Sequence, residues 1–535
     1  MGHWENKPFA IPQIRSFIPE KVKPWLVIIG VLIVQLSGGV YLGAINEIVG
    51  STQLLREDIM MAGQASLIGM AIYFTLMFRL KSAVRSKTTL SACLLVMITV
   101  NIACIYVTNV LLLVGLCLVG GFFRMWATFE FNSTIQLWLT PKRDMSVFFC
   151  YIYLVVNGII NLSGIMTSGI AEWASWHYVH WAMTILLLLL YLFVLVAYKG
   201  IAIMPRMPLL GVDWIGMVMW VGVAMTALFV CVYGEHYDWW LSEHIRVATL
   251  LGVVLLLMNL LRASFIRHPY YMLRTFTFSI LPLTIMVIVL ADILLAPSHI
   301  FEHALMADVL GYDELHVASL NWVGVAGTVA GILFTWLCFA RRKWTYQHML
   351  VIGFSLFALY LLYFYFMIDY NLPKGALVLP IFIRSAGYVM VAVAMLTAIT
   401  RMPFPSHFTQ GISIHNMFSA VLAGAIGTAV VGRLMKIVMT ERVSVLSEGL
   451  DRVALGGVRN VDMVFADVYK QAMLESMKEI YGWLLLLAIV CLIGLCLRHS
   501  AIHPKKVIHP TFRVIYNLYR REIKARIRQR RMARS

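Results

Sequence analysis

The sequence predicts an all-α polytopic membrane protein with about fourteen transmembrane helices. Three observations lead to this fold class. The 535-residue chain is 61% hydrophobic and only 13% charged, whereas soluble domains are roughly half apolar and about a quarter charged. Its apolar blocks are about as long as a bilayer-spanning helix, and the polar gaps between them are short. Positive charge is concentrated in alternate gaps, which is the pattern that sets membrane orientation.

The spans follow from requiring about 20 mostly apolar residues in each. The first six lie near 25–45, 60–80, 88–107, 109–132, 147–170 and 177–198. A middle pair lies near 214–233 and 245–265. The last six lie near 276–297, 318–339, 348–367, 377–400, 412–434 and 480–497. This order predicts two six-helix bundles with an inserted two-helix hairpin between them.

The same plan divides the chain into five parts. We expect a cytoplasmic N-terminal segment (1–24), an N-terminal bundle (25–205), an inserted hairpin (206–268), a C-terminal bundle (269–500) with a periplasmic segment at 435–479, and a basic cytoplasmic tail (501–535). The periplasmic segment has apolar residues at helical spacing, so we expect a cap of short helices there; a solvated linker is the alternative.

Loop charges predict the orientation. The connections at 78–87, 141–144 and 340–344 are basic, whereas 298–317 contains Asp, Glu and His but neither Lys nor Arg. Positive loops stay in the cytoplasm, so both termini are expected there, in the cell inner membrane. The tail interleaves cations with apolar residues, which suggests an amphipathic helix on the anionic leaflet. The net charge of +17 therefore indicates membrane topology and no nucleic-acid partner.

Ionisable residues inside spans are costly and usually face the bundle interior. Glu130 and Asp292 are the candidate proton carriers, because a carboxyl in a low dielectric can bind and release a proton. Arg124 is a candidate for tuning a neighbouring carboxyl or binding an anionic group, and His415 is a candidate titrating group. The alternative for each is a structural ion pair or a polar contact between helices.

Amide, cationic and aromatic residues inside the spans are the candidates for a substrate cavity. They are Asn157, Asn161, Arg384, Asn416, Trp126 and Trp322. Small residues cluster beside the asparagines, and such residues permit close helix contact. Close packing alone is the alternative for the asparagines, and anchoring at the membrane surface is the alternative for the tryptophans.

Motifs for catalysis or cofactor binding are missing from the sequence. The eight cysteines all lie in apolar blocks without a CxxC pair, so we interpret them as buried thiols. There is no Walker A loop, HExxH or GxSxG. We therefore expect no metal, no cofactor and no enzyme activity, and an ion gradient is the remaining energy source for moving a small-molecule substrate.

Several sequence stretches appear in the order of a known family. They are SWHYVHW (175–181), VDWIGMVMWVG (212–222), GEHYDWWLS (234–242), HPYYMLRTF (268–276), RSAGY (384–388) and QGISIHNMFSAVLAGAIGTAVVG (410–432). Through them the chain resembles the fourteen-span drug:proton antiporters (EmrB/QacA type) of the major facilitator superfamily, over nearly all of residues 25–497. The resemblance implies proton-driven export of hydrophobic or amphipathic compounds by alternating access. It also implies a periplasmic adaptor and an outer-membrane channel as partners.

The chain departs from the family pattern at several coupling positions. Ser37 and Asn46 stand where an acidic residue and Pro are usual, Ser82 where Asp is usual, and Ile165 where Pro is usual. These departures favour two alternatives beside multidrug efflux. One is export of a specific endogenous metabolite or lipid, and the other is a membrane sensor that does not transport.

Overall fold

The computed structural model describes residues 13–38, 41, 45–140, 144–200, 209, 211–448 and 461–497. Within these ranges, thirteen helices are long and apolar enough to cross a membrane, judged by length and composition. A shorter apolar helix, Lys23–Leu36, lies in the first predicted span. The described residues contain no strand beyond an isolated bridge between Ile14 and Tyr198. The predicted all-helical, multi-pass membrane fold is confirmed.

The first bundle contains the six N-terminal spans. They are α1 (Lys23–Leu36) with α3 (Ile45–Ser51), α4 (Arg56–Ala83), α5 (Ser86–Tyr106), α6 (Val110–Leu139), α7 (Met145–Trp173) and α8 (Trp176–Ala197). Within the first predicted span, α1 ends at Leu36, and residues 39–40 and 42–44 lie outside the described residues. The third and fourth spans separate at Asn109, whose side chain accepts hydrogen bonds from the backbone N–H groups that begin α6. An asparagine at this position caps the helix.

The inserted pair consists of α9 (Trp214–Tyr233) and α10 (Glu243–Phe265), joined through the short 3₁₀ turn Trp239–Leu241. Asp213 begins α9, and its Oδ1 accepts hydrogen bonds from Gly216 N at 2.9 Å and from Arg262 Nη2 on α10 at 2.7 Å. An ion pair therefore links α9 to α10. Helix α9 packs against α4 and α19, whereas much of α10 is exposed apolar surface, as expected of a lipid-facing helix.

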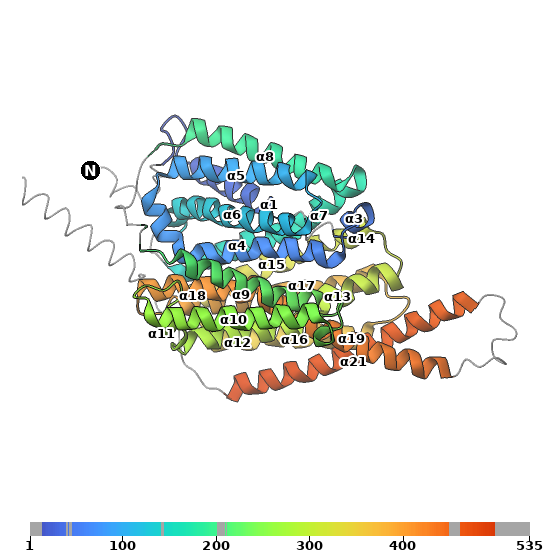
Figure 1. Cartoon of the computed structure of the whole chain (residues 1–535). Helices are drawn as coiled ribbons and strands as arrows, with labels where there is room; N and C mark the ends of the chain where they lie inside the picture. Colours follow the sequence, from blue (N-terminus) through green and yellow to red (C-terminus); the bar gives the residue numbers. More distant parts are fainter. Residues whose placement is uncertain are drawn as a thin grey trace, which may run out of the picture.

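The second bundle contains the last six spans, several of them in segments. They are α12 (Ile280–Leu295) with α13 (Pro297–Ala304) and a π-turn (Leu305–Val309); α14 (Glu314–Ser319) with α15 (Asn321–Thr335) and a π-turn (Trp336–Arg341); α16 (Tyr346–Met367); α17 (Lys374–Ile399); α18 (Pro405–Met417) with a π-turn (Phe418–Leu422) and α19 (Ala423–Glu448); and α21 (Val461–Leu497). A one-turn helix, α11 (Leu273–Phe276), precedes them. The two bundles lie side by side, with α9 and α10 against them (Figure 1).

Two connections differ from their prediction. The segment 298–317 was expected to be an external loop, but helix continues past Pro297 to Val309, because Pro is tolerated in the first turn of a helix. The segment 435–479 was expected to be a cap of short helices; its described parts, 435–448 and 461–479, differ from this expectation, and 449–460 lie outside the described residues. Instead, α19 and α21 are long helices that extend beyond the other helices (Figure 1), since neither contains Pro or Gly in this stretch to end it. The tail 501–535 lies outside the described residues.

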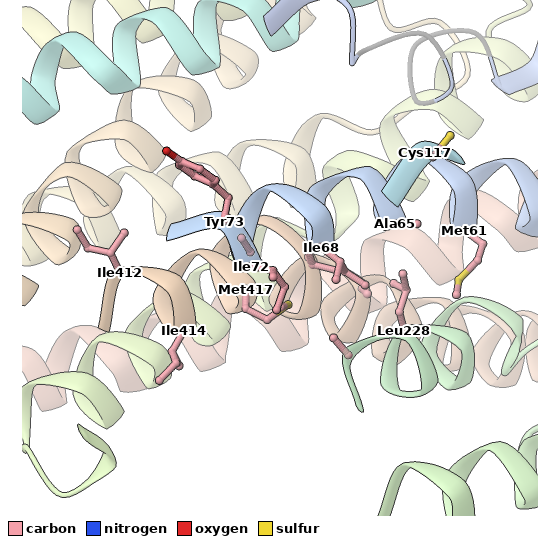
Figure 2. Close-up of a cluster of buried hydrophobic side chains, with 14 of the residues drawn as sticks. Met61, Ala65, Ile68, Ile72, Tyr73, Cys117, Leu228, Ile412, Ile414 and Met417 are labelled. Carbon is pink, nitrogen blue, oxygen red and sulfur yellow. The ribbon is translucent and has the colours of Figure 1, made fainter. Parts of the chain in front are cut away.

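The bundles meet mainly along two helix pairs, α7 with α15 and α4 with α18, and α7 also contacts α17. Buried side chains of α4, including Met61, Ala65 and Ile68, lie near Leu228 of α9 and Met417 of α18 (Figure 2). One hydrophobic cluster thus joins the first bundle, the inserted pair and the second bundle. We use "basic-loop face" for the end of the molecule that carries residues 84–85, 144 and 342–345, and "opposite face" for the other end.

Candidate functional site

The α7–α15 contact is built from reciprocal asparagine–glycine pairs. A Cβ added to Gly324 of α15 would lie 2.5 Å from Asn161 Oδ1 of α7. A Cβ added to Gly164 of α7 would lie 2.8 Å from Asn321 Nδ2 of α15. Each glycine therefore makes room for an amide from the other bundle. Asn161 Nδ2 also donates to Asn157 O at 2.9 Å, so the predicted residues Asn157 and Asn161 are both at or beside the bundle interface.

The α4–α18 contact is held by polar groups near the helix backbones. Ser413 Oγ of α18 donates to Ala71 O of α4 at 2.8 Å, and lies 2.6 Å from the Tyr271 hydroxyl. Gln410 Oε1 accepts from Met272 N at 3.1 Å. Tyr271 and Met272 belong to the link that follows α10, and the adjacent Tyr270 donates to Ile72 O of α4. This link is therefore hydrogen-bonded to both bundles at their contact.

Asp292 of α12 is half-buried, with a buried Oδ2 atom and no ion-pair partner among the described residues. Its Oδ2 has no hydrogen-bond partner. The hydroxyls of Tyr153 on α7 and Tyr388 on α17 lie within electrostatic range. Helices α7 and α17 belong to different bundles and contact each other. Asp292 therefore lies close to the bundle interface, where a change in packing would alter its surroundings.

Glu130 has a partner inside its own bundle. Its Oε2 lies 3.6 Å from Lys81 Nζ of α4, and both side chains are buried. Lys81 also donates to Ser133 Oγ and lies 5.5 Å from the centre of the Phe129 ring. The sequence placed Lys81 in a loop, and the structure places it in the last turn of α4. The pair joins α4 to α6 and leaves Glu130 in a different environment from Asp292.

A second buried ion pair was missed because Glu302 was assigned to an external loop. Glu302 Oε2 of α13 lies 3.4 Å from Arg384 Nη2 of α17, and Tyr360 donates to Glu302 Oε1 at 2.8 Å. The predicted cavity residue Arg384 is therefore paired within the second bundle. The sequence signal that could have revealed this pair is the apolar run through 300–301 and 304–306, which continues the helix.

The remaining predicted residues do not gather at one point. His415 of α18 is buried, and neither ring nitrogen has a hydrogen-bond partner in the described part of the chain; the adjacent Asn416 is half-buried. Trp126 of α6 stacks on Phe123. Trp322, at the start of α15, is 56% exposed. Their predicted roles in coupling or in a substrate cavity stay predictions.

Arg124 lies apart from Glu130 in a small pocket of the first bundle. Its guanidinium occupies the space beside Gly38, where an added Cβ would be 0.7 Å from Nη1. The pocket is lined by Ser37 and Gly38, which follow α1, by Tyr41, and by residues of α4, α5, α6 and α8. The pairing of Arg124 with a carboxyl that the sequence suggested is not seen among the described side chains.

An ion pair between the bundles lies at the basic-loop face. Lys343 Nζ, which follows α15 and its π-turn, donates to Asp144 Oδ2 at 2.5 Å. Asp144 also caps α7 by accepting from Ser146 N at 3.1 Å. Burial raises the pKa of Asp144, but the hydrogen bonds from Lys343 and Ser146 outweigh burial and hold it below its usual value. The pair therefore links the two bundles at the point where α7 begins.

No protein-family model matches the sequence, and no curated protein matches it. Solved structures do match. The peptide transporter POT in complex with sulfate is 14% identical and aligns over 92% of this chain and 99% of its own, with a TM-score of 0.55. The nucleoside transporter NupG is 12% identical over 89% and 99%, and the human organic anion transporter MFSD10 (TETRAN) is 12% identical over 89% and 100%, both with TM-scores of 0.52.

The chain has the major facilitator fold. Two bundles of six helices, here with an inserted pair, pack side by side as expected from the resemblance. At such low identity the likeness concerns the fold, so the drug:proton antiporter family remains a prediction. In this fold the two halves are related repeats, and the substrate and coupling sites lie near the middle of the membrane between them.

Proposed function

We propose that this protein is a proton-coupled transporter that moves a small organic molecule across the membrane by alternating access. Asp292 is the observation that carries the proposal. An ionised carboxyl inside the membrane is costly unless it is paired or hydrated. Asp292 has no described cation beside it, so it holds a proton in this conformation. Rocking of the bundles that opens its site to water would allow the proton to leave.

The structure favours Asp292 over Glu130 as the proton carrier. Glu130 is paired with Lys81 of the same bundle, so movement of one bundle against the other leaves this carboxylate with its partner. Asp292 interacts with Tyr153 of the other bundle, so bundle movement changes its environment. A proton-coupling group requires this dependence on conformation.

The test compares Asp292→Asn with wild type in proteoliposomes. Asn mimics the neutral carboxyl, so we expect pH-gradient-driven accumulation to fall at least tenfold while substrate exchange without a gradient stays within about twofold. The matched control is Asp308→Asn, which removes a carboxyl at an exposed position of the same span. Accumulation at the wild-type level in Asp292→Asn would rule out this residue as the proton carrier.

The direction and compound class come from the sequence. Basic loops stay in the cytoplasm, so we assign the basic-loop face to the cytoplasm and the protein to the inner membrane, with export of hydrophobic or amphipathic compounds as the working hypothesis. Uptake into inverted vesicles across a panel of dyes, lipids and metabolites tests it. A response to a single compound class would favour the endogenous exporter, and absence of any flux would favour the sensor.

Helices α19 and α21 are where we look for a periplasmic adaptor that leads to an outer-membrane channel. They extend past the opposite face (Figure 1), and Val445, Phe465 and Tyr469 are exposed on them. Exposed apolar side chains on a projecting element are typical of a protein contact. Photo-crosslinkers at these three positions should capture an adaptor in cells, and crosslinking only to lipid would contradict this partner.

A further inference from the structure

Arg124 is a buried cation without a described anion. Its side chain is buried, with the residue 4% exposed, and its Nε has no acceptor among the described residues. Nη2 points at the Met70 sulfur, which is a weak acceptor. No carboxylate lies within ion-pair distance among the side chains that the structure describes. A buried charge normally has a partner. This guanidinium is therefore available to pair with a bound anion.

The pocket around Arg124 provides polar groups and space. Gly38 leaves the volume that the guanidinium occupies. Tyr41, Ser66, Asn101 and His180 also line the pocket. His180 Nδ1 lies 3.2 Å from Asn101 Oδ1, and its Nε2 has no partner. Several hydrogen-bonding groups therefore surround a single positive charge.

The second bundle contains a corresponding arginine that is paired with a carboxylate. Arg384 lies on the fourth span of the second bundle, as Arg124 does in the first. The charge of Arg384 is balanced by Glu302, which comes from the first span of its bundle. The first span beside Arg124 offers Ser37 and Gly38 instead. Arg384 is thus paired with a carboxylate of the chain, whereas Arg124 borders a pocket without a described carboxylate.

We propose that this pocket binds a carboxylate of the transported compound, which makes the substrate a small organic acid or a molecule with one acidic group. A guanidinium binds a carboxylate through two parallel hydrogen bonds. The small pocket and single cation suit a monoanion better than a phosphate dianion. This inference rests on the proposed transport function.

The experiment measures binding, so a failure of proton coupling does not affect it. The purified full chain in phosphatidylcholine nanodiscs is titrated with acetate, acetamide and sulfate, and binding is followed by thermal unfolding and calorimetry without a pH gradient. We expect acetate to bind saturably and raise the unfolding temperature, while acetamide and sulfate do not. Preference for sulfate, or equal binding of acetamide, would overturn the proposal.

Three variants assign the site to Arg124. Arg124→Gln should weaken acetate binding at least tenfold. Without acetate it should unfold no earlier than wild type, because a buried unpaired charge is gone. Gly38→Ala keeps every charge but displaces the guanidinium, and should also lose acetate binding; it decides the question if Arg124→Gln does not fold. Arg246→Gln removes an exposed cation and should bind acetate within twofold of wild type.

A lipid headgroup is the other source of a carboxylate. Nanodiscs containing phosphatidylserine distinguish it from a soluble acid. If the pocket serves the transported compound, acetate affinity is the same with and without this lipid. Loss of acetate binding in phosphatidylserine, or wild-type affinity in both Arg124→Gln and Gly38→Ala, would refute the assignment.

Discussion

The ion pair between Asp144 and Lys343 should hold the bundles together at the basic-loop face. Its side chains are only 15% and 29% exposed, respectively, so solvent screens the pair less than an ordinary surface pair. Lys343 has φ of 57°, a left-handed conformation that costs a non-glycine residue about 1–2 kcal/mol. This unfavourable backbone conformation occurs at the position where the Lys343 ammonium contacts the other bundle.

The magnitude follows from the geometry. Exposed pairs contribute about 0–1 kcal/mol, and hydrogen bonds to charged groups contribute about 1.5–3 kcal/mol. For this partly buried pair we expect a coupling of about 1–2 kcal/mol, which is a factor of roughly 5–30 in an equilibrium constant. Lys343→Gln should therefore raise the ratio of open to closed molecules at the basic-loop face by that factor.

The assay is a double-mutant cycle read by spin-label distances across this face in nanodiscs. It compares wild type, Lys343→Gln, Asp144→Asn and the double variant. Asn still caps a helix, so Asp144→Asn should keep α7 intact while removing the charge. A coupling energy below about 0.3 kcal/mol, within the additivity expected of independent sites, would refute the reasoning.

The pH dependence of this contact has a definite sign. The pKa of Asp144 is lower when paired than in the separated state, so its contribution is fully present above the separated-state pKa, about 4. It is lost as pH falls through the lower, paired-state pKa. The open fraction should therefore not change through this pair between pH 6 and pH 8. A midpoint near neutrality that Asp144→Asn removes would contradict the contact described here.

Two further predictions concern packing and buried charge. Gly324→Ala places a methyl group 2.5 Å from Asn161 Oδ1, so it should destabilise the protein by about 1–3 kcal/mol, measured by thermal unfolding. Adding Asn161→Ala should recover part of the loss. An unchanged unfolding midpoint in Gly324→Ala would mean that the bundles are not close-packed there. Lys81→Met leaves Glu130 buried and unpaired, which should cost about 3–5 kcal/mol, and adding Glu130→Gln should restore most of it. Equal stability of Lys81→Met and the double variant would mean that Glu130 does not depend on Lys81.

Hydropathy was sufficient to predict the helices. The seventh span was expected at 214–233 and α9 occupies Trp214–Tyr233. The predicted separation of the third span (88–107) from the fourth (109–132) is confirmed by the cap at Asn109. The physical reason is that a chain in lipid must hydrogen-bond every backbone polar group internally. Each apolar block of this length therefore forms a helix.

Assignment of helices by hydropathy failed in polar segments. Glu302 lies in a stretch rich in Glu and His, which indicated a loop, yet Arg384 and Tyr360 allow its carboxyl to be buried in a helix. The partners are 82 and 58 residues away in sequence by their numbering. Hydropathy is summed over neighbours in the chain, so it cannot show that a distant cation will offset the cost of burial.

The sequence by itself determined the membrane class, the helices and which residues carry charge inside the membrane. Only the tertiary structure decided the role for which each charge is suited. Glu130 and Asp292 are both carboxyls in apolar helices, but Lys81 lies beside the first and no described cation lies beside the second. Arg124 and Arg384 differ in the same way. The charge of a side chain is local, whereas the groups that balance it come from whichever helices pack against it.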